Sequence, residues 1–171
     1  MIIRPLDAAE AELLLPELAG LLVDAVAHGA SVNFLRGFSE TDGHVFWRGQ
    51  LPGVADGSRR LLVAEEDGRL LGTVVLTFAH QPNQPHRGDI GKMLVHSGAR
   101  RRGLGRALLA AAEEEARRFG RTLLCLDTEE GSQGDALYRA CGWTPIGTIP
   151  GFALSPDGIP AGATFFYKPI G

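Results

Sequence analysis

The segment with the clearest chemistry combines four arginines with two glycines. Its residues, in chain order, are Arg100, Arg101, Arg102, Gly103, Leu104, Gly105, Arg106 and Ala107. The first turn of a helix has unpaired N–H groups and the positive end of the helix dipole. Glycines let the backbone approach an anion closely, and the arginines add positive charge. If a helix begins here, the segment is suited to bind a phosphate or pyrophosphate.

Two other interpretations of this segment stay open. A glycine-containing turn between a strand and a helix, with solvated arginines, explains the same composition. The arginines could also contact nucleic acid. The segment is not a Walker loop, because no Gly-Lys-Ser/Thr follows, and Leu108 breaks a full G-x-G-x-x-G dinucleotide fingerprint.

The elements that must position this segment follow from periodicity and capping signals. Apolar residues at helical spacing predict a first helix that begins after Asp7, is interrupted near Pro16 and ends at Gly29. A second helix is predicted after Ser39, a long one over 103–119 and a short one over 135–141. Strands are predicted at 2–4, 61–64, 70–77, 90–96, 122–127, 144–149 and 164–168, with a hairpin turn at 66–69.

This order of elements predicts the fold class. Helices come first, then an antiparallel meander, then strands alternating with helices. We therefore expect an α/β (α+β) fold with a mixed, mostly antiparallel sheet and helices on both of its faces. The length of 171 residues, without repeats or linkers, predicts one domain over residues 1–171.

Composition limits the partners and the compartment. The formal net charge of −3 argues against a general nucleic-acid binder. No apolar stretch reaches the roughly 20 residues that cross a bilayer, and no signal peptide is indicated, so we expect a cytoplasmic protein without a membrane partner. Cys125 and Cys141 stand in apolar patterns, which predicts reduced core thiols and no metal site. A monomer and a homodimer are both compatible with the sequence.

Two motifs resemble a known family. Arg100-x-x-Gly103-x-Gly105 resembles the acetyl-CoA signature of the GNAT superfamily of acetyltransferases, and it lies between a predicted strand and a long helix. Downstream, Ala136-Leu137-Tyr138-x-x-x-Gly142-Trp143 resembles a second segment of that family. The segments 89–95, 126–129 and 150–153 look like the tabtoxin-resistance type, which acetylates an amine-bearing β-lactam.

The resemblance implies an N-acetyltransferase that moves acetyl from acetyl-CoA to a small amine, amino-acid-like or an antibiotic. The implied reaction is direct attack in a ternary complex, without a metal. The pyrophosphate would bind the amides of the arginine–glycine segment. The pantetheine would pair with the backbone of Met93, Leu94 and Val95, although these residues also fit a plain core strand. A protein or peptide N-acetyltransferase and a non-catalytic CoA-binding sensor are the alternatives.

The resemblance also suggests catalytic roles. Tyr138 can donate a hydrogen bond or a proton to the departing thiolate, or it can be a half-buried packing residue. Asp89 and Asp127 can accept the proton of the substrate amine or bind its positive charge. Asp127 could instead cap a turn with Ser132.

The acceptor side is the least defined part of the predicted site. The segment containing Asn33 and Phe34 and the segment 151–162 are expected to form its walls. His80, His86 and His96 are further titratable candidates, and the first two are expected to be solvated.

Overall fold

The computed structural model describes residues 1–171 and contains one seven-stranded sheet. Its strand order is β1-β2-β3-β4-β5-β7-β6, and β4 with β5 is the one parallel pair. The bounds are β1 Ile2–Leu6, β2 Arg59–Glu66, β3 Arg69–Phe78, β4 Arg87–Val95, β5 Leu123–Glu129, β6 Thr144–Leu154 and β7 Pro160–Pro169. The predicted mixed, mostly antiparallel sheet is confirmed.

Six α-helices accompany the sheet. They are α1 Ala8–Leu13, α2 Leu15–Ala27, α3 Glu40–Arg48, α4 Leu51–Ala55, α5 Leu104–Arg118 and α6 Gln133–Ala140, and a short 3₁₀ turn, η1, covers Ser97–Ala99. The break near Pro16 is confirmed, because α1 ends before it and α2 begins with it in its first turn. Helix α4 was not predicted. Helix α6 begins earlier than predicted because Ser132 caps it and accepts from Asp135 N–H.

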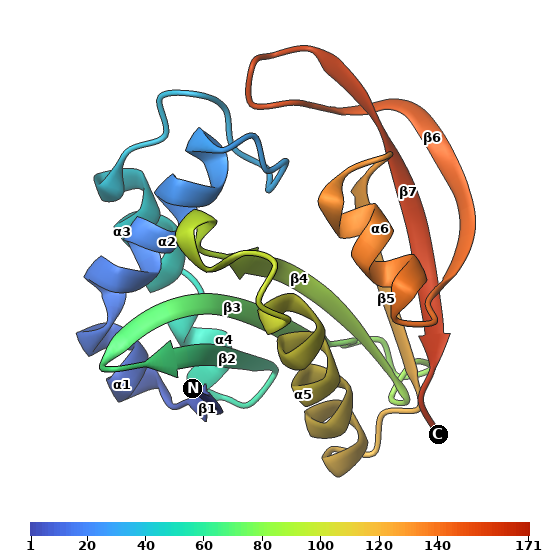
Figure 1. Cartoon of the computed structure of the whole chain (residues 1–171). Helices are drawn as coiled ribbons and strands as arrows, with labels where there is room; N and C mark the ends of the chain where they lie inside the picture. Colours follow the sequence, from blue (N-terminus) through green and yellow to red (C-terminus); the bar gives the residue numbers. More distant parts are fainter.

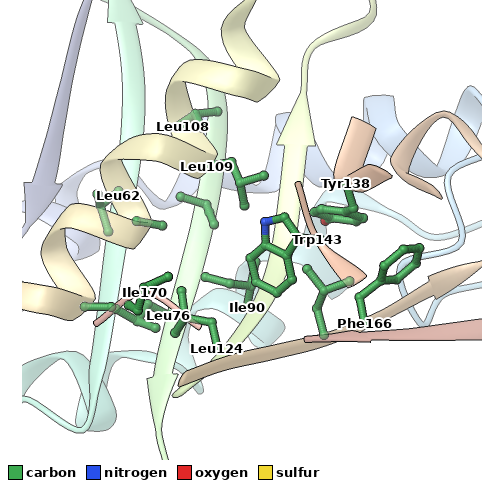
Figure 2. Close-up of a cluster of buried hydrophobic side chains, with 14 of the residues drawn as sticks. Leu62, Leu76, Ile90, Leu108, Leu109, Leu124, Tyr138, Trp143, Phe166 and Ile170 are labelled. Carbon is green, nitrogen blue, oxygen red and sulfur yellow. The ribbon is translucent and has the colours of Figure 1, made fainter. Parts of the chain in front are cut away.

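Helices cover both faces of the sheet, as predicted (Figure 1). On one face, α5 and α6 pack on a cluster that includes Leu108, Leu124, Trp143 and Phe166; Figure 2 shows these side chains together. On the other face, α1 to α4 enclose a second cluster around Trp47. Because both clusters share one continuous sheet, we propose that residues 1–171 fold as a single domain.

The two parallel strands β4 and β5 separate after a short paired stretch. They are in register only from Arg87 opposite Leu123 to Asp89 opposite Cys125. Beyond that point β4 stays paired with β3, and β5 stays paired with β7. Figure 1 shows the two strands diverging, with α6 beside β5. The divergence leaves facing strand edges that do not pair with each other.

No helix in the chain is both long and apolar enough to cross a membrane. No group of three or more His, Cys, Asp or Glu side chains is placed to hold a metal ion.

Helix α3 provides a test of local stability. Ser39 and Asp42 form a capping box, in which Ser39 Oγ accepts from Asp42 N–H at 3.2 Å and Asp42 Oδ2 accepts from Ser39 N–H at 2.9 Å. We expect Ser39→Ala to lower the free energy of unfolding by about 1 kcal/mol, because the amide of Asp42 at the helix start loses its side-chain acceptor. Urea denaturation measures this, and the exposed Thr41→Ala is the control. Equal midpoints for both variants would contradict the role of the cap.

Candidate active site

A cavity of about 780 Å³ opens where β4 and β5 separate. That volume is within the range of small-molecule and cofactor sites. Five parts of the chain line it: the end of α2 with residues 29–33, strand β4 from Ile90 to Val95, the start of α5, the end of β5 with α6, and parts of β6 and β7. Segments far apart in the sequence therefore form one site at the divergence of the sheet.

The start of α5 forms one end of the cavity. Gly103 precedes the helix with a φ of 84°, in the left-handed region that glycine adopts without strain. No side chain caps the helix, so its first N–H groups are free to bind an anion. Gly103, Leu104, Gly105 and Arg106 all line the cavity. A Cβ atom on Gly105 would lie 3.0 Å from Leu137 Cδ2, so a side chain there would fill cavity space between the start of α5 and α6.

The arginines of this segment divide into two groups. Arg100, Arg101 and Arg106 line the cavity. Arg102 points away from it and donates to Glu66 Oε2 at 2.6 Å, which lowers the pKa of Glu66. Ala107 does not line the cavity either, and its amide is not free for an anion because it donates to Gly103 C=O. The charge and the free amides at this end fit a phosphate group.

Strand β4 contributes backbone and apolar surface. Met93, Leu94 and Val95 all line the cavity. Met93 and Val95 pack against the buried cluster beneath α5 and α6, whereas Leu94 is buried in the cluster around Trp47 on the opposite face of the sheet. These residues therefore combine core packing with an edge that β5 leaves unpaired, so the two interpretations of this strand are compatible.

Tyr138 lies on α6 with its ring in the core and lines the cavity. The ring centroid is 5.8 Å from that of Trp143 and 5.9 Å from that of Phe166, and Figure 2 shows the three rings together. The hydroxyl has no hydrogen-bond partner within the protein. Burial raises the pKa of Tyr138 well above its usual value, and the negative charge of Asp127 adds to the effect. The side chain is therefore a protonated donor.

The two predicted acids share one face of the sheet but differ in surroundings. Asp127 is exposed and lines the cavity on β5. Asp89 lies at the last position of β4 that pairs with β5, opposite Cys125, and does not line the cavity. Arg87 donates to Asp89 Oδ1 at 2.6 Å. Burial nevertheless raises the pKa of Asp89, and repulsion from Asp127 contributes in the same direction.

The alternative roles of the surrounding side chains are also resolved. Ser132 caps α6 and does not pair with Asp127. His96 Nδ1 accepts from Gly98 N–H at 3.1 Å, so this histidine shapes the turn before the arginines. His80 and His86 do not line the cavity.

The acceptor side is formed by the two predicted segments, with one difference. Asn33 lines the cavity, and so do Phe152 and Ala153 on β6. Phe34 does not, because its ring packs against Phe38 at 4.1 Å and Phe46 at 5.3 Å between centroids. The predicted segment is therefore a wall of the site, but its aromatic residue belongs to the layer behind it.

Sequence reasoning missed Lys92, which lines the cavity from a bulge in β4. Its ammonium lies over the rings of Phe34 and Phe46. A single lysine within the otherwise apolar run 90–95 was the available signal. The sequence did not indicate toward which face it would point.

A sheet divided at a parallel pair, with an uncapped helix start facing the division, defines a GNAT-type fold. The chain belongs to the GNAT family of acetyltransferases, because residues 24–143 match the profile described as "Acetyltransferase (GNAT) family".

Individual relatives resemble the chain to different extents. A mycothiol acetyltransferase of Kineococcus radiotolerans is 41% identical over 91 residues, which are 52% of this chain and 28% of that protein. The chain thus spans little more than a quarter of that relative. The structure of a ribosomal-protein-alanine N-acetyltransferase from Brucella melitensis is 27% identical with a TM-score of 0.79, covering 99% of each chain.

A second solved structure carries a ligand. It is the acetyltransferase yncA from Salmonella typhimurium with its cofactor acetyl-CoA, which is 22% identical with a TM-score of 0.76. The alignment covers 100% of this chain and 94% of that one. At this identity, the likeness concerns the fold.

Proposed function

We propose that the protein transfers acetyl from acetyl-CoA to the nitrogen of a small-molecule amine. The observation that carries this proposal is that one cavity joins the open start of α5, the free edge of β4, Tyr138 and Asp127. A module that only bound CoA would not need a buried phenol and a carboxylate beside the same space. The family membership supports the same reaction class.

The cofactor would be held by two kinds of group. The amides of Gly103 to Arg106 and the side chains of Arg100, Arg101 and Arg106 supply donors and positive charge for the pyrophosphate. The unpaired edge of β4 supplies backbone groups for an extended chain, as an added strand would use them. Bound acetyl-CoA would supply an activated acetyl thioester to the amine.

Tyr138 is the donor available to the departing sulfur. Its raised pKa keeps the hydroxyl protonated. Because a thiol is a stronger acid, with a pKa of about 8.5, full proton transfer from this phenol to a thiolate is unfavourable. The hydroxyl therefore stabilises the sulfur by a hydrogen bond, and solvent can deliver the proton.

The two carboxylates would have different roles toward the substrate amine. Asp127 lines the cavity and can bind the substrate ammonium. Asp89 has the raised pKa and can accept the proton, through an intervening water because it does not line the cavity. A base with a raised pKa holds a proton more readily near neutral pH, which favours this role.

A pH–rate profile of two variants tests this division. Asp89→Asn should lower kcat/KM by about 10²-fold between the pKa of Asp89 and that of the amine, where the carboxylate is ionised and little neutral amine exists, and less at high pH. Asp127→Asn should mainly raise KM. It should also move the acidic limb to lower pH, because the loss of its charge lowers the pKa of Asp89. If both variants match the wild type at every pH, neither carboxylate handles the amine.

The acceptor is proposed to be amino-acid-like or an antibiotic of the tabtoxin-resistance type. The segments 89–95, 126–129 and 150–153 support this by resemblance. The mycothiol acetyltransferase relative is consistent with a small acceptor, although the matched region is part of that protein.

A second candidate is a protein N-terminus, as the name of the Brucella relative suggests. Against it, the loop after α2 meets the tip of the β6–β7 hairpin (Figure 1). Arg36 N–H donates to Pro156 C=O at 2.7 Å, and the Arg36 side chain pairs with Asp157 at 2.5 Å. This contact covers the acceptor end and favours small molecules.

The two candidates are separated by competition. An amino acid and an octapeptide with an N-terminal alanine are offered together with acetyl-CoA, and the products are identified by mass spectrometry. We expect the amino acid to be acetylated faster. Preferential acetylation of the peptide would favour the second candidate.

A further inference from the structure

Lys92 has an unusual backbone for a lysine. The register of β3 and β4 shifts between Thr73 and Val75, and the extra residue on β4 places Lys92 at a φ of 45°. Thr73 Oγ1 donates to Lys92 C=O at 2.9 Å and holds the bulge. The left-handed region is strained for a non-glycine residue. A side chain kept at such a position is aimed by the bulge, as bulges often do near active sites.

The Lys92 side chain ends in an apolar layer beside the cavity. Its Nζ atom is 5.2 Å from the ring centroid of Phe46 and 5.7 Å from that of Phe34. It forms no salt bridge and no hydrogen bond within the protein, whereas Lys168, the other lysine, donates to Glu113 and to Cys141 C=O. Burial lowers the pKa of Lys92, and the one charge that opposes the effect is that of Asp127.

Lys92 is only partly exposed, and an ammonium that has lost part of its water without gaining a hydrogen-bond partner in the protein is costly. Contact with two aromatic rings offsets part of that cost. The rings leave the N–H groups of Lys92 without an acceptor, while the residue lines the cavity. An anionic group of a bound molecule would supply both the acceptor and the opposite charge.

We propose that Lys92 binds a carboxylate of the acceptor, so that the enzyme selects zwitterions that carry both an amine and a carboxylate. Asp127 and Lys92 line the same cavity with opposite charges. A zwitterion bound between them places its amine at Asp127 and its carboxylate at Lys92. This inference rests on the proposed function, because it names the acceptor class of the same site.

The test measures binding in the CoA complex, where no transfer occurs. The probes are ω-amino acids from glycine to 6-aminohexanoate, each compared with its primary amide, a neutral group of nearly the same size. Calorimetry gives the affinity of each pair for the wild type, Lys92→Met and Lys92→Arg. The methionine keeps an unbranched side chain between the rings, and the arginine keeps the charge.

At the best chain length, the wild type should bind the acid about 10-fold or more tightly than its amide, as a charge-assisted hydrogen bond requires. The ratio should fall to near one in Lys92→Met and be partly kept in Lys92→Arg. A wild-type ratio of one at every length would overturn the proposal, whether or not the variants fold. An unchanged ratio in folded Lys92→Met would also overturn it, because the lysine would then only pack.

Transfer from acetyl-CoA to the same probes is measured in parallel. The probes could show a Lys92-dependent preference in binding while none of them is acetylated. That result would support the Lys92 inference and contradict the proposed function. Acetylation of acids and amides at equal efficiency would support the proposed function and overturn the Lys92 inference.

Discussion

Tyr138→Phe should lower kcat by about 10²–10³-fold, because the variant loses the one buried hydrogen-bond donor beside the departing sulfur. The hydroxyl has no partner within the protein, and the ring keeps its contacts with Trp143 and Phe166. Stability and CoA affinity should therefore remain close to wild type. Steady-state kinetics, calorimetry with CoA and thermal unfolding measure the three quantities.

The raised pKa of Tyr138 adds a pH criterion to this prediction. Because the phenol stays protonated as the pH rises through its usual range, the loss of rate in Tyr138→Phe should not depend on pH below about 10. Tyr167, the other tyrosine, does not line the cavity, so Tyr167→Phe is the matched control. A wild-type kcat in Tyr138→Phe would show that the tyrosine only packs.

Gly105→Val should weaken CoA binding by at least about 10²-fold, which corresponds to the loss of two charge-assisted hydrogen bonds. A Cβ atom at this position lies 3.0 Å from Leu137 Cδ2 and 3.9 Å from Val95 Cγ2. The flexible end of Leu137 can move, so the fold should survive. The valine methyl groups would still occupy cavity space beside the first turn of α5, between Leu137 and Val95.

Gly147→Val is the control for this variant. Gly147 lies on the exposed strand β6, where an added Cβ atom has no neighbour within 4 Å, and valine suits a strand. Calorimetry should give wild-type CoA affinity for it. If folded Gly105→Val bound CoA as tightly as Gly147→Val, the start of α5 would not be the pyrophosphate site.

Local signals were sufficient to predict most of the fold. The capping box of Asp7 with Glu10, the interruption near Pro16 and the hairpin turn at 66–69 each depend on residues close in sequence. At the hairpin, Asp67 and Gly68 adopt φ values of 51° and 73°, as a tight two-residue turn requires. Helix α4 was missed because its five residues are too few to show a helical period.

The site was predicted less completely, because its details depend on contacts between distant segments. The position of Arg102 is decided by Glu66, which lies 36 residues earlier in the chain. Phe34 leaves the cavity because α3 provides Phe46 as a packing partner. Lys92 acquires its role from a bulge, which strand periodicity does not reveal.

The most direct test of the proposed activity follows thiol release from acetyl-CoA over a panel of amines. Amino acids, dipeptides, polyamines and aminoglycosides are each incubated with the wild type and with Tyr138→Phe, and the products are identified by mass spectrometry. Our account predicts thiol release that depends on the amine, an N-acetylated product in equal amount, and a large loss of rate in Tyr138→Phe. CoA binding without amine-dependent thiol release for any member of the panel would contradict it and indicate a binding module.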